Sequence, residues 1–299
     1  MTITARPGRP STVVLIAVAA LVAGAVAMAI SPVFVRVAGA ADVGPFTSAF
    51  YRVFLALPLL WIWARLELSR SGQPDPGWTW QMVVVGLLFA GDLFFWHLAV
   101  LKTTITNATL LATMAPIWVA AFSSLFIGEP VTRPTILGLA ICVAGGAVLV
   151  GSSSSYAPER FLGDLFGIGT SFFFGLYFLA VRVARRTAPA GAVLFRSTIV
   201  TAAALAVVAG VMENSWLPAG WLGAGALVLM AWVSHAGGQG LLAFALGHLS
   251  AAFSSLVIFL EAVAGALFGW LIYGEALGPL ELLGGAGILA GIWIARPRT

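Results

Sequence analysis

Charged residues are scarce in this chain: they make up 9% of its 299 residues, whereas hydrophobic residues make up 61%. A soluble domain has about a quarter of its residues charged, so this chain has too few charges to cover a surface in contact with water. Its apolar runs are also longer than the strands of about ten residues that build an outer-membrane barrel. The composition therefore predicts an all-α integral membrane protein.

Residues that build several other kinds of site are missing as well. The single cysteine, Cys142, lies inside a hydrophobic run, so no disulfide framework and no cysteine-based metal site is predicted. The sequence contains no GxxxxGK[S/T] motif, which argues against ATP hydrolysis. A pI near 9.8 would suggest nucleic acid as the partner of a soluble protein, but here the basic residues lie between apolar runs, where they orient a membrane protein. We expect no cofactor, no metal and no nucleic-acid partner.

Ten apolar runs are long enough to cross a membrane, at about 20 residues per crossing. They lie near residues 11–34, 44–64, 79–98, 103–127, 133–151, 161–184, 190–212, 221–244, 249–273 and 278–296. The first run follows Arg6 and Arg9, but it is longer than the core of a signal peptide, which favours a retained span.

The two halves of the sequence repeat each other. The tetrapeptide Val-Arg-Val-Ala occurs at residues 35–38 and again 146 residues later, at 181–184. Four dipeptides recur at the same offset: Ala90-Gly91 with Ala236-Gly237, Gly128-Glu129 with Gly274-Glu275, Leu137-Gly138 with Leu283-Gly284, and Ala144-Gly145 with Ala290-Gly291. We therefore predict two domains, 1–152 and 153–299, with five spans each. An odd number of spans inverts the second copy relative to the first, as in many secondary transporters.

The basic residues predict the orientation. With ten spans and a cytoplasmic N-terminus, the cytoplasmic side carries Arg6, Arg9, Arg65, Arg70, Arg133, Arg182, Arg185, Arg186, Arg296 and Arg298. The opposite side carries only Arg36, Lys102 and Arg160. This asymmetry places both termini in the cytoplasm.

Two short segments carry a family resemblance. The span end Leu125-Phe126-Ile127-Gly128-Glu129-Pro130 recurs as Leu271-Ile272-Tyr273-Gly274-Glu275-Ala276, and a Gly-rich span follows each. This pattern resembles the fourth and ninth helices of the drug/metabolite transporter superfamily, in its EamA-type bacterial members. The chain departs from that pattern at Ala262, which stands where many members have a proline equivalent to Pro116.

The resemblance implies ten helices around a central cavity, a location in the bacterial inner membrane, and export of amino acids, drugs or other metabolites. Among the bacterial members the chain is most similar to exporters of aromatic and other neutral amino acids. A small-molecule substrate and membrane lipid are the expected partners, and a monomer is favoured.

Two acids inside the predicted spans are the first candidates for substrate contact, because ionisable side chains within a span usually face a cavity or a partner. Glu261 could contact a substrate amine or carry a proton, or it could be a strut hydrogen-bonded to Ser254 or a neighbouring helix. Asp92 could form an acid-plus-aromatic wall with Phe95 and Trp96, which lie on its helical face. Alternatively, Asp92 pairs with an arginine and Trp96 belongs to an interfacial belt.

Two further spans offer candidate ligand contacts. Trp232, His235 and Gln239 fall on one stripe of an α-helix, which could stack a planar group and hydrogen-bond a carboxylate or amide, although a core histidine is the commoner use. Tyr177 and Phe174 could line an apolar pocket, or they could simply pack. The polar candidates are Ser171 and Asn107, with the same alternative.

The remaining charged groups have simpler interpretations. Arg52 and Arg196 could bind a substrate carboxylate, but reaching toward the nearer membrane surface is the favoured account. Glu129 and Glu275 lie at span ends, where capping or contact with loop arginines is favoured over substrate binding.

Together these features predict a secondary transporter that exports neutral or aromatic amino acids by alternating access. The alternative is a multidrug or cationic-metabolite exporter that uses Glu261 and aromatic side chains. An intramembrane enzyme is disfavoured because no nucleophile–base spacing stands out. A channel is disfavoured because no filter-like sequence or ring of charges is present.

Overall fold

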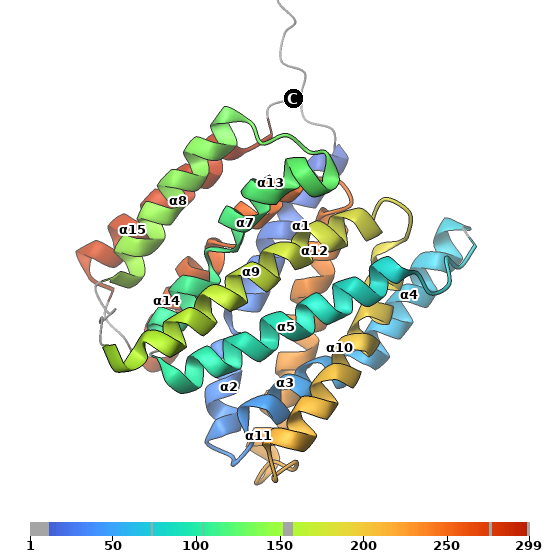
Figure 1. Cartoon of the computed structure of the whole chain (residues 1–299), viewed down its shortest axis with the longest axis vertical. Helices are drawn as coiled ribbons and strands as arrows, with labels where there is room; N and C mark the ends of the chain where they lie inside the picture. The colour runs from blue at the N-terminus through green and yellow to red at the C-terminus, as the bar shows by residue number, and fades with distance from the viewer. Residues whose placement is uncertain (1–11, 73, 104, 152–157, 275–276, 298–299) are drawn as a thin grey trace, which may run out of the picture.

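The computed structural model describes residues 12–72, 74–103, 105–151, 158–274 and 277–297, and these residues form helices and loops without a β-strand (Figure 1). The helices of the first half are α1 (Thr12–Ala29), α2 (Ser31–Gly39), α3 (Pro45–Phe54), α4 (Leu57–Ser71), α5 (Trp80–Lys102), α6 (Ile105–Ala112), α7 (Ala115–Phe122), η1 (Ser123–Ile127) and α8 (Arg133–Gly151). Those of the second half are η2 (Pro158–Arg160), α9 (Phe161–Ala184), α10 (Ala190–Met212), α11 (Trp221–Leu229), η3 (Met230–Gln239), α12 (Gly240–Ala245), α13 (Ala251–Val257), α14 (Leu260–Tyr273) and α15 (Pro279–Ala295). The prediction of an all-helical protein is confirmed for the described residues.

Within the described residues, eight helical segments are long and apolar enough to cross a membrane. They are Thr12–Gly39, Pro45–Ser71, Trp80–Lys102, Asn107–Ile127, Phe161–Ala184, Ala190–Met212, Trp221–Ala245 and Ala251–Ile272. Each overlaps one of the predicted spans. The other two predicted spans correspond to shorter apolar helices, Arg133–Leu149 and Pro279–Ala295. A protein with many membrane spans is therefore established, and the count of ten stays a prediction.

Several of these segments are broken near their middle. Pro32, Pro58 and Pro116 each stand in the first turn of the helix that follows a break, at the starts of α2, α4 and α7. Proline causes such breaks because it lacks the amide hydrogen and its ring clashes with the preceding turn. The segment of α13 and α14 breaks at Ile258–Phe259 without a proline. The helix is therefore interrupted even though Ala262 replaces the proline that many members have at this position.

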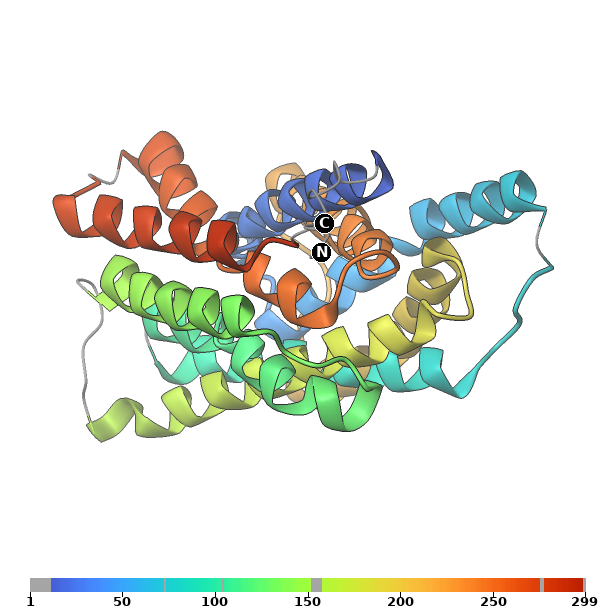
Figure 2. The ribbon, with the colours of Figure 1, turned by 90° about the horizontal axis from the view of Figure 1, so that it is seen from above.

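Helices α8 and α15 pack tightly against each other at one edge of the molecule (Figures 1 and 2). A Cβ atom added to Gly145 would lie 2.8 Å from the carbonyl oxygen of Gly284, and one added to Gly138 would lie 2.5 Å from that of Gly291. Small residues permit this close backbone approach between helices. Because the earlier glycine of α8 meets the later glycine of α15, the two helices run in opposite directions.

Two carboxylates hold helix starts at the two ends of the bundle. Glu213, after α10, accepts hydrogen bonds from the backbone amides of Phe46 and Thr47 in α3, at 2.7 and 2.9 Å. Glu67, near the end of α4, accepts hydrogen bonds from Ala190 and Gly191 at the start of α10, at 3.1 and 2.6 Å. A carboxylate there satisfies exposed amides and complements the positive end of the helix dipole. The end of the α3–α4 segment thus binds the start of α10, and the end of α10 binds the start of α3, so the two segments lie antiparallel.

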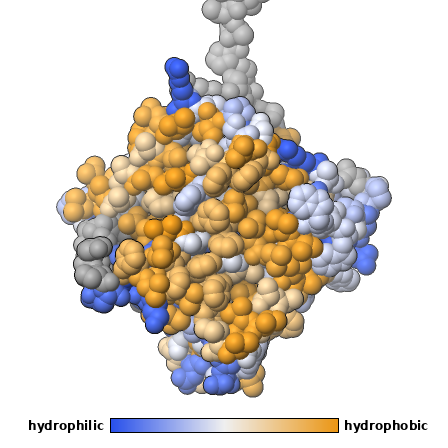
Figure 3. All heavy atoms as spheres, viewed as in Figure 1, coloured by the Kyte–Doolittle hydropathy of each residue, from blue (hydrophilic) through white to orange (hydrophobic). Residues whose placement is uncertain are grey.

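The surface has the apolar character that a membrane requires. In Figure 3, hydrophobic residues cover most of the visible face and hydrophilic residues gather toward its periphery. Exposed large side chains include Trp61, Leu87, Val207, Leu271 and Trp293. Contact of such side chains with lipid tails is favourable, whereas their exposure to water would have a large free-energy cost.

Candidate functional site

A cavity of about 90 Å³ lies among the broken helices. It is lined by Met28, Ser31, Pro32, Arg52, Asp92, Trp96, Thr109, Ala112, Thr113, Thr170, Phe174, Gln239, Ile258 and Glu261. Four of the contributing segments are interrupted beside it, at the junctions of α1 with α2, α3 with α4, α6 with α7, and α13 with α14. Interrupted helices expose backbone groups and often form binding sites in transporters.

Three charged side chains meet in this cavity from three different helices. Arg52 comes from the last turn of α3, Asp92 from the second half of α5, and Glu261 from the first turn of α14. Arg52 is 9% exposed and Asp92 7% exposed, and Glu261 is half-buried. The guanidinium interacts electrostatically with both acids. It forms no direct ion pair with either of them in the described part of the chain.

The charged groups keep unused hydrogen-bonding capacity. One guanidinium nitrogen of Arg52 (Nη2) donates to Ser234 Oγ at 3.5 Å, and its carbon lies 6.0 Å from the centre of the Phe89 ring. The buried Nε of Arg52 and the buried Oε1 of Glu261 have no hydrogen-bond partner among the residues that the structure describes. An unpaired buried polar atom is costly, so a ligand that supplied the missing partners would be stabilised there.

A glutamine adds an oriented amide to the cavity wall. The Tyr177 hydroxyl donates to Gln239 Oε1 at 3.0 Å. Because the amide oxygen accepts this bond, Gln239 presents N–H donors to its other neighbours. Tyr177 itself lies behind the wall, where it stacks on Phe174 with ring centres 5.9 Å apart.

Of the ten residues predicted to contact substrate, the structure brings five to the cavity: Glu261, Asp92, Trp96, Gln239 and Phe174. Four others lie outside its lining. Tyr177 supports Gln239, His235 bonds to Thr198, Ser171 accepts a hydrogen bond from Trp118, and Asn107 bonds to Asp164. These four buried side chains form hydrogen bonds between neighbouring helices.

The structure places Trp232 outside the cavity lining and off the stripe predicted for it with His235 and Gln239. The Trp232 side chain is 48% exposed and donates to the Leu55 carbonyl, whereas His235 and Gln239 are buried. The three do not share a stripe because residues 230–239 form a π-helix, whose wider turn changes the α-helical spacing.

Two other predictions are corrected. Arg52 does not reach toward the membrane surface but is buried and lines the cavity, so sequence reasoning left a cavity residue out of its candidates for the site. Its position one turn before the break at Leu55, in a segment that contains Pro58, is the signal that could have found it. The proposed strut between Ser254 and Glu261 is absent, since Ser254 Oγ and Glu261 Oε1 both lack a partner.

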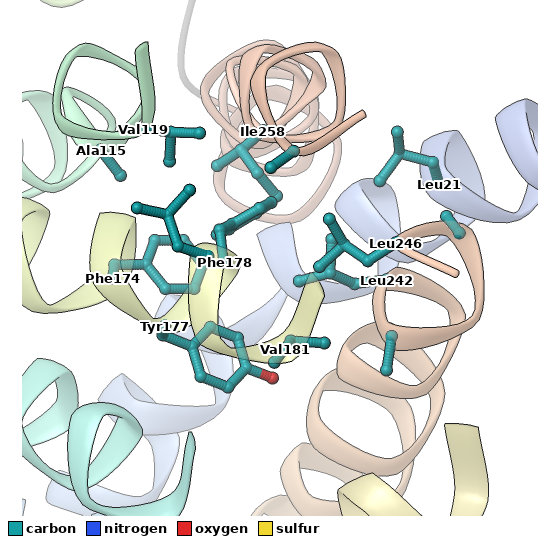
Figure 4. Packing of buried hydrophobic residues seen from close by; sticks show 14 of the residues in the cluster. Leu21, Ala115, Val119, Phe174, Tyr177, Phe178, Val181, Leu242, Leu246 and Ile258 are labelled. Carbon is teal, nitrogen blue, oxygen red and sulfur yellow. The ribbon is translucent and has the colours of Figure 1, made fainter. Parts of the chain in front are cut away.

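An apolar layer lies next to the cavity. Phe174 and Ile258 line the cavity, and they belong to the same hydrophobic cluster as Phe178, Val119 and Leu246 (Figure 4). Phe178 is completely buried. This layer has no side-chain charge that could carry a solute across it.

Beyond the apolar layer lies a polar cluster that we call the arginine latch. It consists of Glu129, Arg182, Arg186 and the backbone amide of Ala251. Glu129 Oε1 is 2.6 Å from Arg182 Nε and 3.7 Å from Arg186 Nη2, and Glu129 Oε2 accepts a hydrogen bond from Ala251 at 3.0 Å. The predicted contact of Glu129 with arginines is confirmed. The second predicted residue of this kind, Glu275, lies outside the described residues.

One face of α9 connects the three layers. Thr170 and Phe174 line the cavity, Phe178 belongs to the apolar layer, and Arg182 belongs to the latch. These residues are four positions apart, so they lie above one another on the same face of the helix. A single helix therefore connects the cavity with the latch, over about 12 Å along its axis from Phe174 to Arg182.

Basic residues make the latch end strongly positive. Burial, together with the neighbouring Arg185 and Arg182, lowers the pKa of His248 below its usual value.

Among the described residues, no group of three or more His, Cys, Asp or Glu side chains is arranged to hold a metal ion.

Similarity to known proteins places the chain in a family of membrane transporters. The fold and its polar cavity within a multispan bundle are those of a membrane transporter. A profile of the EamA-like transporter family matches residues 15–151 and 161–296, and the chain belongs to that family. The resemblance to EamA-type members of the drug/metabolite transporter superfamily is thereby confirmed.

Curated relatives support the same class. The chain is 29% identical over 259 residues to the Pseudopaline exporter CntI of Pseudomonas aeruginosa, which covers 84% of this chain and 85% of the relative. It is 28% identical over 283 residues to an uncharacterized transporter of Archaeoglobus fulgidus, covering 93% of this chain and 95% of the relative. A crystal structure with 20% identity matches 96% of this chain and 97% of its own with a TM-score of 0.81, which shows a common fold.

Proposed function

We propose that this protein is a secondary transporter that exports small metabolites bearing an amino and a carboxyl group, with neutral and aromatic amino acids as the simplest members. It would act in the bacterial inner membrane. The observation that carries the proposal is the meeting of Arg52, Asp92 and Glu261 in one cavity without a direct ion pair. Charges of both signs are held apart there, as a ligand with charges of both signs requires.

Each half of such a substrate has a partner of matching chemistry. A carboxylate can accept two parallel hydrogen bonds from the guanidinium of Arg52, whose Nε is unpaired. The N–H donors of Gln239 can add to this contact. An ammonium group can donate to Asp92 and to Glu261, whose Oε1 is unpaired.

The size and walls of the cavity favour a small substrate over drugs. Its volume of about 90 Å³ is well below the ~300–1,000 Å³ of pockets that hold drug-sized ligands. Trp96 and Phe174 offer flat apolar surface to a side chain, which supports neutral and aromatic amino acids. Export of a cationic metabolite is the second candidate, because the cavity has two carboxylates but a single guanidinium.

We further propose ten spans in two inverted halves. The antiparallel packing of α8 on α15 supports this arrangement, since they would be the fifth span of each half. So do Glu67 and Glu213, which stand 146 residues apart and fasten α3 and α10 reciprocally. The two segments matched by the family profile begin at residues 15 and 161, which is the same offset.

We also propose transport by alternating access, which the order of layers along α9 supports. In the described conformation the cavity is separated from the latch end by the apolar layer and the Glu129–Arg182 contact. The positive-inside rule assigns the arginine-rich latch end to the cytoplasm. Release of the latch, with rocking of one half against the other, would open the cavity to cytoplasmic substrate. The relative named as an exporter supports outward transport.

The test is transport by the purified protein in proteoliposomes, measured as counterflow of radiolabelled alanine, phenylalanine, tryptophan and lysine. Arg52→Gln should lower the rate at low substrate about 100-fold, because removing one partner of a buried charge contact costs ~2–5 kcal/mol. Arg196→Gln is the matched control. That arginine bonds to Asp75 and lies outside the cavity, so its loss should leave transport unchanged.

Absence of counterflow for every amino acid would contradict the proposed substrate class. Equal activity of Arg52→Gln and the native protein would contradict the assigned role of the cavity, even if transport itself were observed.

A further inference from the structure

The cavity charges do not balance. Asp92 and Glu261 contribute two carboxylates and Arg52 contributes one guanidinium, so the three ionised groups together carry one negative charge. The other described residues that line the cavity are apolar or neutral polar side chains and carry no ionised group. Nothing on the cavity wall therefore compensates the second carboxylate.

Neighbouring titratable groups do not supply the missing charge. Arg52 also interacts electrostatically with His97, His235 and Tyr177. Each imidazole has one ring nitrogen in a hydrogen bond and the other buried without a partner, as a neutral ring allows and an imidazolium does not. The Tyr177 hydroxyl donates to Gln239 and is therefore protonated.

An uncompensated charge matters most while the substrate crosses. During alternating access the site passes through a state closed to water on both sides, and burying one unpaired charge there costs several kcal/mol. A protein whose site carries one net negative charge therefore passes through this closed state with difficulty. It passes through readily once a single positive charge has bound in the site.

We propose that this cavity is a single-cation exchange site, in which one positive charge beyond Arg52 must accompany every crossing, supplied either by a proton shared between Asp92 and Glu261 or by the substrate's own net charge. The inference rests on the proposed function and deepens it, because it links the charge of the substrate to proton coupling.

The charge rule separates two classes of amino acid. A neutral zwitterion brings one charge of each sign, so the loaded site still needs its proton and no net proton exchange results. A basic amino acid such as lysine brings one carboxylate and two ammonium groups, and its second ammonium replaces the proton. The carboxyl O–H bond then breaks, the proton passes to water on the side where substrate enters, and a proton from the opposite side rebinds after release. One basic amino acid leaves for each proton that enters.

The charge count can be tested first without any substrate, by infrared spectroscopy of the purified empty protein at neutral pH. Protonated carboxyl groups give a carbonyl band that is distinct from that of carboxylates. The native protein should show one such group. Asp92→Asn and Glu261→Gln should each show none, because one carboxylate then balances Arg52, and Arg52→Gln should show two.

Glu159→Gln, which removes an exposed acid outside the cavity, should leave the band unchanged. A band that is absent from the native protein, or one that survives in both single-acid variants, would overturn the proposal. This readout does not depend on transport, so it remains decisive even if the substrate class is wrong.

The coupling itself is tested with a pair of substrates that differ only by one ammonium group. Lysine and norleucine share their carboxylate, α-amine and straight side chain. In proteoliposomes with a trapped pH indicator, lysine movement should drive an opposite flux of one proton per molecule, and norleucine movement should drive none.

Equal proton flux with both compounds would overturn the exchange rule, as would lysine movement without protons. Movement of norleucine but not of lysine would also overturn it, because a substrate cation could then not replace the proton. If neither compound moves in counterflow, the proposed substrate class fails, whereas the infrared count still decides whether the site holds one exchangeable charge.

Discussion

Carboxylates and arginines meet in two regions of this bundle, with opposite outcomes. In the arginine latch, Glu129 uses both of its oxygens, on Arg182 at 2.6 Å and on the Ala251 amide at 3.0 Å. In the cavity, Arg52 and Glu261 interact only electrostatically, and each keeps a buried polar atom without a partner. The two regions lie about 12 Å apart along one face of α9.

The difference is the one expected between a structural contact and the binding site that we propose. A satisfied ion pair holds helix ends together and has no capacity left for a ligand. Charges held apart in a cavity lose hydration without recovering a full partner, which destabilises the empty protein. Such an arrangement is understandable if a substrate or a proton completes it. Stability measurements on the two regions should therefore respond in opposite ways to loss of a carboxylate.

The largest expected effect is on the latch. Glu129→Gln should lower the free energy of unfolding by about 3 kcal/mol, because breaking a largely buried pair leaves Arg182 and Arg186 together without their anion. Glu261→Gln should not lower it, since that substitution removes a carboxylate whose Oε1 has no partner. Denaturation of the detergent-solubilised proteins, followed by tryptophan fluorescence, measures both.

Equal destabilisation by the two substitutions would remove the distinction between the regions. Glu261 would then be a structural residue, and the assignment of the cavity as a binding site would lose its main support.

A smaller effect is expected where packing without charge joins two helices. Gly284→Ala should cost about 2 kcal/mol of stability, typical of an overpacked contact, because its Cβ would lie 2.4 Å from the backbone nitrogen of Leu149. Gly285→Ala is the matched control on the next residue, where the nearest atom would be 3.8 Å away. Thermal unfolding of the two variants in the same detergent measures the difference. Similar melting of both would mean that α8 and α15 are free to separate.

The smallest effect belongs to an ion pair at the surface, Asp75 with Arg196. Asp75 is 53% exposed, so Asp75→Asn should change stability by less than ~0.5 kcal/mol. The Gly77 amide and the Arg196 guanidinium lower the pKa of Asp75 below its usual range. Its contribution is therefore full above about pH 4 and is lost as the pH falls through the lowered pKa of the folded state. Urea unfolding of the native protein and Asp75→Asn at several pH values checks this. The two should differ slightly above about pH 4 and converge at the lowest pH, so a difference in stability that grows as the pH falls would contradict it.

Much of the architecture could be predicted from the sequence because lipid imposes a local rule. A segment that crosses a membrane must be apolar over its whole length and must satisfy its own backbone, so each span is visible as a run of residues. The eight candidate spans overlap predicted runs for this reason. Glu261 and Asp92 could be found likewise, because an acid within such a run needs a special environment.

The breaks within the spans were harder to predict. Pro32, Pro58 and Pro116 mark three of them, but the interruption at Ile258–Phe259 has no proline and depends on the surrounding packing. The π-helix before Gln239 was also not visible in the sequence, and it places Trp232 on the outside. Local propensity does not specify such changes of helical turn.

The sequence by itself determined that this protein lies in a membrane and which runs of residues form its long apolar helical segments, since both follow from hydrophobicity along the chain. Only the tertiary structure decided that Arg52 turns inward to meet Asp92 and Glu261, while Glu129 is satisfied by Arg182. The rotation of each helix about its axis selects these neighbours, and that rotation is set by packing among residues far apart in the sequence.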